Sequence, residues 1–320
     1  MSTLLDLALL GSNPDRIRRV MMAGERAIRS EIASCPDPAR RWPVEGVGFL
    51  TDGELPAGLA SLPDAPPWLF LRGTIPPGPA VAVVGSRRAT RYGLELARRI
   101  GRTVGGAGWP VISGLALGID AAAHEGCLEV GGTALAVLGS GIDVWYPRSN
   151  RRLGERILES GGGIVSEFGP GITPEPWRFP FRNRIISGLA SVVIVVEAAV
   201  RSGALITAHL AVAQGREVMA VPGDIDRATS VGCNLLIRDG AHPVTTLDDL
   251  VETIEFWLGP APAQSPRASG LLALLPATIE ELVTGSGGTI TDVMVEVMSL
   301  QASGAVQVVD GVVRERARQA

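Results

Sequence analysis

Lysine is absent from this sequence, so all 29 of its basic residues are arginines. Every fixed positive side-chain charge is therefore a guanidinium group, and a site for phosphate or carboxylate would have to use these planar donors. Coding bias also produces such a composition, and the absence of lysine alone assigns no function. The net charge of −4 argues against a protein whose whole surface attracts nucleic acid.

Cysteine is scarce, and Cys35, Cys127 and Cys233 are widely separated along the chain. They form no CxxC pair and have no histidine at ligand spacing, a pattern that argues against disulfides and against zinc. We therefore expect the three cysteines to behave as small apolar residues, and we predict no metal site.

Long hydrophobic runs are missing as well. The most apolar stretch, residues 192–200, is interrupted by Glu197 and is far shorter than a membrane span. The leucine-rich start of the chain contains Asp6 and has no basic residue before it, unlike a secretory signal. These absences predict a soluble, cytoplasmic protein with no membrane partner.

Short apolar runs alternate with helical patterns between residues 81 and 244. Apolar residues recur on one face of these helical patterns, as Leu94, Ala97 and Ile100 do. Alternation of this kind is typical of a parallel sheet covered by helices on both faces. We therefore predict an α/β fold with an extended, doubly wound, Rossmann-like sheet. Its strands are predicted at 81–84, 111–112, 134–138, 163–165, 192–196 and 218–221.

Smaller segments flank this Rossmann-like domain, which we place at residues 74–258. Residues 1–73 are helical in pattern at first and then rich in proline and glycine, which predicts a small N-terminal module with helical and extended parts. Residues 259–268 (GPAPAQSPRA) have the composition of a linker. A separate C-terminal domain is predicted to follow at residues 269–320.

The C-terminal segment 269–320 has the pattern of a winged-helix-like domain. Capping boxes at Thr278 and Thr289 each open a helical pattern. An Asp310-Gly311 turn then separates two apolar runs, which is a strong signal for a hairpin. The segment carries six acidic residues against three arginines, a balance that opposes contact with DNA.

Small residues follow the first three predicted strands, as GSR at 85–87, SG at 113–114 and GSG at 139–141. In a doubly wound sheet the ligand lies beyond the carboxyl ends of the strands, where backbone amides and helix N-termini hold phosphate. Ordinary tight turns would contain the same residues. This pattern alone therefore leaves both interpretations open.

Cofactor motifs are absent from the sequence. A nicotinamide or flavin site needs GxGxxG after the first strand, but here the bulky Arg87 and Arg88 follow Ser86. The chain also lacks the GxxxxGKS or GxxxxGKT motif that binds ATP. We therefore predict that the protein uses no cofactor.

Residues 177–184 (WRFPFRNR) interleave three arginines with three aromatic residues in a chain that is only 4% aromatic. Arginines that follow a phosphate backbone, beside rings on which bases stack, are what sequence-tolerant binding of single-stranded DNA requires. The alternative is a loop whose rings fill the core and whose arginines face solvent. Composition alone does not decide between them.

Six motifs occur in order along the chain. They are GSR (85–87), SGLALGIDAAAH (113–124), YP (146–147), FPFRNRIISGL (179–189), EAAVRSGALITA (197–208), and PG with GCNLLIRDGA (222–241). Together they resemble the DNA-processing protein A (DprA/Smf) family over roughly residues 75–250. The resemblance implies a Rossmann-like protein that binds single-stranded DNA, forms homodimers and catalyses nothing. It also implies that the protein protects incoming DNA and loads a RecA-type recombinase onto it during natural transformation.

The resemblance also implies which residues bind DNA. The basic DNA pocket is expected to contain Arg87, Arg182 and Arg184. Further candidates in the same motifs are Gly85, Ser86, Arg178, Phe179 and Asn183. Three more begin a helix after the fifth strand, where hydroxyls and free amides can add phosphate contacts, namely Ser202, Gly203 and Thr207.

Other parts of the chain are not expected to bind DNA. Asp120 and His124 match the family pattern, but they lie on a helix that follows a strand end, and we expect them to cap or to pack. The N-terminal module of many relatives resembles a helix-hairpin-helix domain, whereas residues 11–14 (GSNP) lack the GxG turn that this motif needs. We therefore expect no DNA contact from residues 1–40.

The main alternative function is an enzyme. Rossmann-like phosphoribohydrolases that cleave nucleoside monophosphates resemble this core, and Glu167 or Glu197 would supply the catalytic carboxylate. Their PGGxGTxxE signature is absent, and residues 202–207 (SGALIT) occupy the comparable place without the trailing glutamate. A second alternative, an architectural adaptor without DNA affinity, is opposed by the arginines that the motifs retain.

Overall fold

The structure, a computed structural model, describes residues 3–10, 14–33, 43–260, 274–286, 289–302, 306–309 and 311–315. The chain divides into two compact units, Met1–Pro262 and Ala263–Ala320. The division falls inside the predicted linker 259–268, most of which lies outside the described residues.

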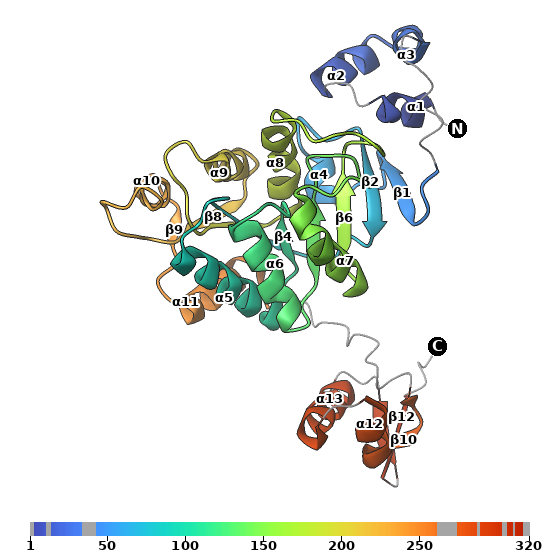
Figure 1. Ribbon diagram of the computed structural model, residues 1–320, viewed down its shortest axis with the longest axis vertical. Coiled ribbons are helices and arrows are strands. Elements are labelled where there is room, and N and C mark those ends of the chain that lie inside the picture. The colour runs from blue at the N-terminus through green and yellow to red at the C-terminus, as the bar shows by residue number, and fades with distance from the viewer. Residues whose placement is uncertain are drawn as a thin grey trace. The chain divides into compact units, whose positions relative to one another are not determined.

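The described part of the first unit is built on a nine-stranded sheet of order β1-β2-β6-β5-β4-β3-β7-β8-β9 (Figure 1). The strands from β6 to β9 in this order are parallel, whereas β1 and β2 are antiparallel additions at the β6 edge. The predicted Rossmann-like α/β fold is confirmed, with all six predicted strands in place. The strands are β1 Val47–Thr51, β2 Trp68–Gly73, β3 Val81–Val84, β4 Val111–Ser113, β5 Ala134–Val137, β6 Gly163–Ser166, β7 Val192–Val195, β8 Glu217–Ala220 and β9 His242–Pro243.

The central strands are continuous apolar runs, so both of their faces must be buried. Helices accordingly cover both faces of the sheet. One core contains α5 Arg91–Ala107, α6 Ile119–Glu129, α7 Arg151–Glu159 and α11 Leu247–Leu258. The other contains α4 Ala57–Ala60, α8 Arg178–Leu189, α9 Gly203–Ala213 and α10 Val231–Arg238. This two-faced burial is the physical basis of the doubly wound arrangement.

Helix α5 shows how the sequence determines the two ends and the buried face of one of these helices. The Thr90 hydroxyl accepts a hydrogen bond from the Gly93 amide at the N-cap, and Gly108 ends the helix with φ 107°. Ala97, Ile100 and Val104 are buried as predicted, but Leu94 is 38% exposed because it lies in the first turn, at the edge of the buried face. A Cβ at Gly101 would lie 2.1 Å from the Ala123 carbonyl oxygen, so glycine permits the close contact with α6.

The predicted boundary between residues 73 and 74 does not separate an independent N-terminal module. Strand β2 carries the buried Trp68, Leu69 and Phe70 and pairs with β6, with Phe70 opposite Ser166. Its apolar side chains and its backbone groups therefore complete the sheet of the Rossmann-like domain.

Three helices precede these strands: α1 Thr3–Leu9, α2 Pro14–Met22 and α3 Glu25–Ala33. Leu7, Ala8 and Leu9 of α1 are buried in the same core as the sheet. Residues 11–13, the larger part of the GSNP turn, lie outside the described residues, as does Cys35. Cys127 and Cys233 are buried reduced thiols, which donate to the backbone oxygens of Thr133 at 3.4 Å and Val195 at 3.7 Å.

The second unit contains two helices and a three-stranded antiparallel sheet in its described part. The Thr278 capping box is confirmed, since the Thr278 amide donates to Glu281 Oε2 at 2.8 Å and the Glu281 amide to Thr278 Oγ1 at 3.3 Å. Gly311 turns the predicted hairpin with φ 77°, and Asp310 lies outside the described residues. The winged-helix assignment stays a prediction. The elements are β10 Ala277–Thr278, α12 Ile279–Ser286, α13 Ile290–Ala302, β11 Val306–Val309 and β12 Val312–Glu315.

Within the described segments, no helix is both long and apolar enough to cross a membrane. The same segments contain no group of three or more His, Cys, Asp or Glu side chains that could hold a metal ion.

Candidate nucleic-acid interface

A pocket of about 620 Å3 lies beyond the carboxyl ends of β3 and β7. These two strands are neighbours at the point where the chain order of the sheet reverses, since β4 follows on one side and β8 on the other. Ligands of doubly wound sheets bind at such a switch point. The walls are the loop after β3, the loop after β7, the N-terminus of α9 and one face of α8.

Nine of the eleven candidate residues line this pocket. They are Gly85, Ser86, Arg87, Phe179, Arg182, Asn183, Ser202, Gly203 and Thr207. The structure also places Arg88, Tyr146 and Arg201 in the lining, and these were not predicted as site residues. Their signal was present in the sequence, because Tyr146 and Arg201 fall inside recognised motifs and Arg88 directly follows one.

The segment 177–184 belongs mainly to helix α8, and it separates its side chains onto two faces. Phe179, Arg182 and Asn183, spaced three and four residues apart, line the pocket. Arg178 and Arg184 do not, although both were candidates. The helical period thus divides the candidate arginines between two different environments.

Arg87 and two aromatic rings form an open platform in the pocket. The Arg87 guanidinium lies 4.7 Å from the centre of the Phe179 ring, and the Phe179 and Tyr146 ring centres are 5.3 Å apart. Arg87 is exposed and Tyr146 is 44% exposed, so both can meet a ligand from solvent. A positive charge beside accessible rings can bind a phosphate and a stacked base together.

Arg182 lies at the floor of the pocket and is only 4% exposed. It donates to the carbonyl oxygens of Gly114, at 2.8 Å, and Val137, and its Nε donates to Asn183 Oδ1 at 3.1 Å. Burial lowers the pKa of Arg182 to about 10, with the Arg87 charge acting in the same direction and Asp120 opposing them. The guanidinium therefore remains charged at neutral pH.

Asp120 and His124 are buried beside this floor. The Asp120 carboxylate accepts from the amides of Gly114 at 3.1 Å and Ala116 at 3.4 Å, so it fixes the loop before α6 and does not cap this helix, whose N-cap is Gly118. Burial raises the pKa of Asp120, whereas Arg182 acts to lower it. Burial lowers the pKa of His124 to about 3, and neither ring nitrogen has a hydrogen-bond partner within the described part of the chain. His124 is therefore neutral and packed.

The N-terminus of α9 opens onto the same pocket. Ser202 is the N-cap, and its hydroxyl accepts from the Ala204 amide at 3.3 Å. A Cβ built on Gly203 would meet nothing within 4 Å, so the space beside this first residue of the helix is open. The helix dipole favours an anion at this position, next to the exposed Arg201.

Two glycines of the predicted phosphate-holding turns have a different role. A Cβ at Gly114 would lie 2.3 Å from the Arg182 guanidinium nitrogens, and one at Gly139 would lie 2.7 Å from the Phe179 ring. Side chains of α8 therefore occupy the space beside these two turns where an anion would have to bind. Glycine at 114 and 139 thus positions α8 against the strand ends.

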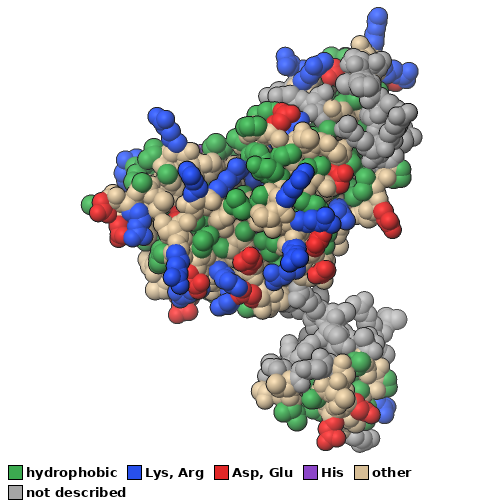
Figure 2. All heavy atoms as spheres, in the orientation of Figure 1, with side chains coloured by type: hydrophobic (Ala, Val, Ile, Leu, Met, Phe, Trp, Pro, Cys, Tyr) green, Lys and Arg blue, Asp and Glu red, His purple; other side chains and the backbone are tan. Residues whose placement is uncertain are grey.

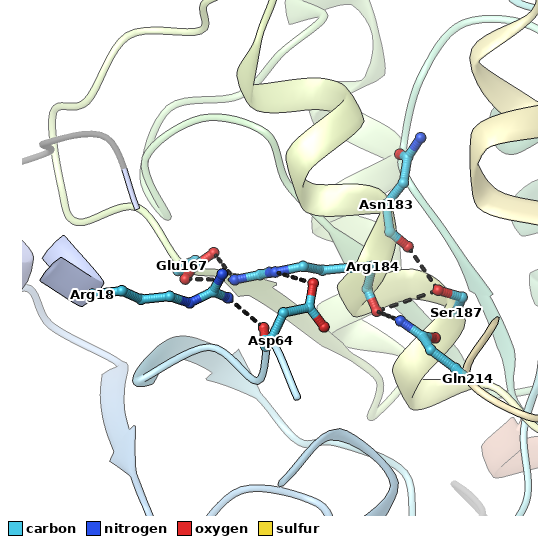
Figure 3. Close-up of polar contacts among 7 residues, drawn as sticks. All are labelled: Arg18, Asp64, Glu167, Asn183, Arg184, Ser187 and Gln214. Atoms are coloured by element: carbon cyan, nitrogen blue, oxygen red, sulfur yellow. Dashed lines mark hydrogen bonds and ion pairs between the residues drawn. The ribbon is translucent and has the colours of Figure 1, made fainter. Parts of the chain in front are cut away.

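Arg184 is buried away from the pocket, and the expectation that it lies on the pocket rim is wrong. Its Nη2 donates to both carboxylate oxygens of Glu167 at 2.8 Å (Figure 3). Its guanidinium also stacks 4.1 Å from the Phe181 ring centre. A guanidinium is stable in the interior when a carboxylate and a ring replace its hydration. Arg178 is likewise buried, 5.0 Å from the ring centres of both Phe168 and Trp177.

The two carboxylates considered for catalysis are both engaged in the structure. Glu167 is paired with Arg184, and Glu197 accepts from the Thr90 amide at 2.8 Å and the Thr90 hydroxyl at 2.6 Å. Neither side chain lines the pocket. Their hydrogen bonds give both of them structural roles.

The exposed arginines of the pocket are not engaged in ion pairs within the described part of the chain, although Asp120 and Glu175 also line the pocket. Across the described segments, no carboxylate lies within ion-pair distance of Arg87, Arg88 or Arg201. Elsewhere, exposed arginines such as Arg98 and Arg102 pair with a carboxylate, here Glu129. Figure 2 shows arginine side chains spread across the visible face of this unit. The lack of ion-pair partners for these three arginines in the described part of the chain, and not the total number of arginines, makes the pocket an attractive site for an anion.

Known proteins with similar sequences were found over most of this unit. The family model described as DNA recombination-mediator protein A matches residues 47–255. Protein Smf of Escherichia coli (strain K12) is 39% identical over 274 residues, which cover 80% of this chain and 73% of that protein. The DNA processing protein DprA of Streptococcus pneumoniae (strain ATCC BAA-255 / R6) is 43% identical over 209 residues, 65% of this chain and 73% of that protein.

Two solved structures are similar in fold as well. DNA processing protein A from Streptococcus pneumoniae superposes with a TM-score of 0.67 at 33% identity, covering 79% of this chain and 98% of that one. The Helicobacter pylori DNA processing protein A, described for its single-stranded DNA binding mode, gives 0.58 at 26% identity and covers 64% of this chain and 95% of that one. Since the family model spans the whole sheet and the pocket, the chain belongs to the DNA recombination-mediator protein A family.

Proposed function

We propose that the protein binds single-stranded DNA in the pocket at the β3 and β7 strand ends. The observation that carries this proposal is the exposed Arg87 stacked on Phe179 beside Tyr146. A single strand offers phosphates and unstacked base faces at once, whereas a duplex hides its base faces within the stack. Arg88, Arg201 and the open N-terminus of α9 add positive potential around this platform.

The proposed biological role is that of a recombination mediator that acts on single-stranded DNA. The chain belongs to a family named for that role, and two of its solved relatives are DNA processing proteins. We further propose that it acts in the cytoplasm as a homodimer, protects incoming DNA and loads a RecA-type recombinase onto it. The engagement of Glu167 and Glu197 in structural hydrogen bonds supports a binding protein without catalytic activity.

Binding of labelled oligonucleotides tests this proposal. We expect a clear preference for single strands over a blunt duplex of the same sequence, measured by anisotropy at two salt concentrations. The logarithm of the binding constant should fall with the logarithm of salt concentration with a slope of about −0.7 per phosphate neutralised. Equal affinity for the duplex contradicts a pocket that stacks unpaired bases.

A further inference from the structure

The second face of α8 carries an ion network that does not touch the pocket (Figure 3). Arg184 is at its centre, with its side chain 3% exposed. Besides its bidentate contact with Glu167, its Nε lies 3.5 Å from Asp64 Oδ2. Two carboxylates from separate parts of the fold therefore share one guanidinium.

The N-terminal helix α2 supplies the other cation of this network. Arg18 donates from Nη2 to the backbone oxygen of Asp64, and its guanidinium lies 5.9 Å from the centre of the Phe181 ring. The same ring stacks on Arg184, so one aromatic side chain of α8 contacts guanidinium groups from two elements. Burial raises the pKa of Glu167, and both Arg184 and Arg18 act to lower it.

The network is directly connected to the residues that line the pocket. Arg182, Asn183 and Arg184 are consecutive on α8, so a rotation or shift of this turn moves all three. The Asn183 amide nitrogen donates to the Gly203 carbonyl oxygen at 3.2 Å, at the N-terminus of α9. Gln214, which follows α9, donates to the Arg184 carbonyl oxygen at 3.2 Å. Helix α8 is thus fixed on one side by the network and on the other side by α9.

We propose that Arg18, Asp64, Glu167 and Arg184 position α8, and that docking of the N-terminal helices thereby regulates the affinity of the pocket for single-stranded DNA. The inference rests on the proposed function. Without Arg18, two carboxylates face one buried guanidinium, and their mutual repulsion is no longer offset. The turn of α8 that carries Arg182 and Asn183 then loses its fixed position, although no DNA contact has been removed.

Substitutions of the two carboxylates distinguish a positioning role of the network from direct electrostatic attraction of DNA, because the two explanations predict opposite changes in affinity. Asp64→Asn and Glu167→Gln remove a negative charge, which by electrostatics alone strengthens binding of a phosphate backbone. The proposed network predicts the opposite result, a weakening of about fivefold, in the range typical of coupling between sites. Asp64 is 40% exposed, so its substitution leaves the fold intact even if the buried Glu167 does not tolerate change.

Variants of the N-terminal helices provide the matched comparison. Arg18→Gln should weaken single-strand binding about fivefold, whereas Arg26→Gln, the same charge change at an exposed position of α3, should not. Arg18→Lys keeps the charge and should restore most of the affinity. If Arg18→Gln and Arg26→Gln behave alike, and Asp64→Asn binds as well as or better than the wild type, the network does not control the pocket.

Hydrogen exchange measured without DNA keeps this test independent of the proposed function. Amides of residues 179–187 should exchange faster in Asp64→Asn and Arg18→Gln than in the full-length wild type, while those of α5 are unchanged. Unchanged exchange in residues 179–187 overturns the positioning role. A wild-type protein that does not bind single strands contradicts the proposed function instead, and the exchange rates still decide whether the network holds α8.

Discussion

Arg87 is the exposed cation of the pocket platform, and its side chain contributes little to the core. Arg87→Gln should therefore leave the melting temperature unchanged and weaken single-strand binding about tenfold, equivalent to about 1.4 kcal/mol, because a charge-assisted phosphate contact is lost. Arg99→Gln provides the control, since Arg99 is equally exposed on α5 but lies outside the pocket. Equal losses in both variants would indicate general charge attraction and no specific site.

The buried His124 should make the folded protein less stable at acidic pH. Its pKa falls from 6.5 to about 3 in the folded protein because burial disfavours the charged ring. Between these pH values the unfolded chain binds a proton at His124 that the folded protein does not bind. The free energy of unfolding therefore decreases as pH falls below 6.5. This histidine contributes up to about 1.4 kcal/mol per pH unit to the decrease. Urea unfolding at pH 7 and pH 5 measures the effect.

Substitution of His124 tests this assignment. His124→Gln removes the titrating group, so the variant should lose less stability than the wild type between the two pH values. His209→Gln, at an exposed position of α9, should keep the wild-type dependence. Identical pH dependence in all three proteins would place the acid sensitivity elsewhere.

Helix α8 is the element in which one sequence motif serves two purposes. Toward the pocket, Phe179 is partly exposed and Arg182 forms the floor, whereas Arg184 on the other face is buried in an ion pair with Glu167. Arg184→Ala should therefore lower the free energy of unfolding by about 3–5 kcal/mol, since Glu167 is left buried without its partner. The sequence motif placed Arg184 among the DNA-binding candidates, and an exposed arginine in that role would not contribute this stability.

A double variant separates the ion pair from the packing around it. Arg184→Met combined with Glu167→Leu removes both charges and should recover much of the stability, because neither residue then pays for an unpaired buried charge. Chemical unfolding compared among the wild type, Arg184→Ala and the double variant gives the result. No recovery in the double variant would assign the loss to packing against Phe181.

The sequence predicted the strands well because each is a short apolar run between turn residues, a pattern that depends only on burial. It did not predict α8. Pro180 and the mixed aromatic and basic residues hide the helical period, although a proline in the first helical turn removes no intrahelical hydrogen bond. Which arginines are buried depends on partners such as Glu167, far away along the chain, so no local pattern contains that information.

At the scale of the whole molecule, the two units have separate hydrophobic cores. A chain that ends at Pro262 should therefore fold and retain its single-strand affinity, because the pocket lies entirely in the first unit. The removed segment carries six acidic residues and four arginines, so its net charge is negative and like charges oppose its approach to DNA. We expect its loss to impair a protein contact instead.

Comparison of the full chain and the shortened chain on one oligonucleotide checks this expectation. If the two affinities agree within a factor of about two, the second unit does not contribute to DNA binding. A decrease of about tenfold or more on shortening, about 1.4 kcal/mol, would show that this unit binds DNA despite its charge. Melting curves of the shortened chain confirm that the first unit stays folded in the comparison.

The pairing of β2 with β6 also determines when the protein can complete its sheet during synthesis. Strand β6 is made about a hundred residues after β2, which is several seconds at roughly 5–20 residues per second. Until then, Trp68, Leu69 and Phe70 can pair only with β1, and the edge of β2 that later meets β6 stays open. A nascent chain stalled before Gly163 therefore displays a hydrophobic β1–β2 pair with one open edge, which is the kind of segment that chaperones bind and that aggregates when they are absent.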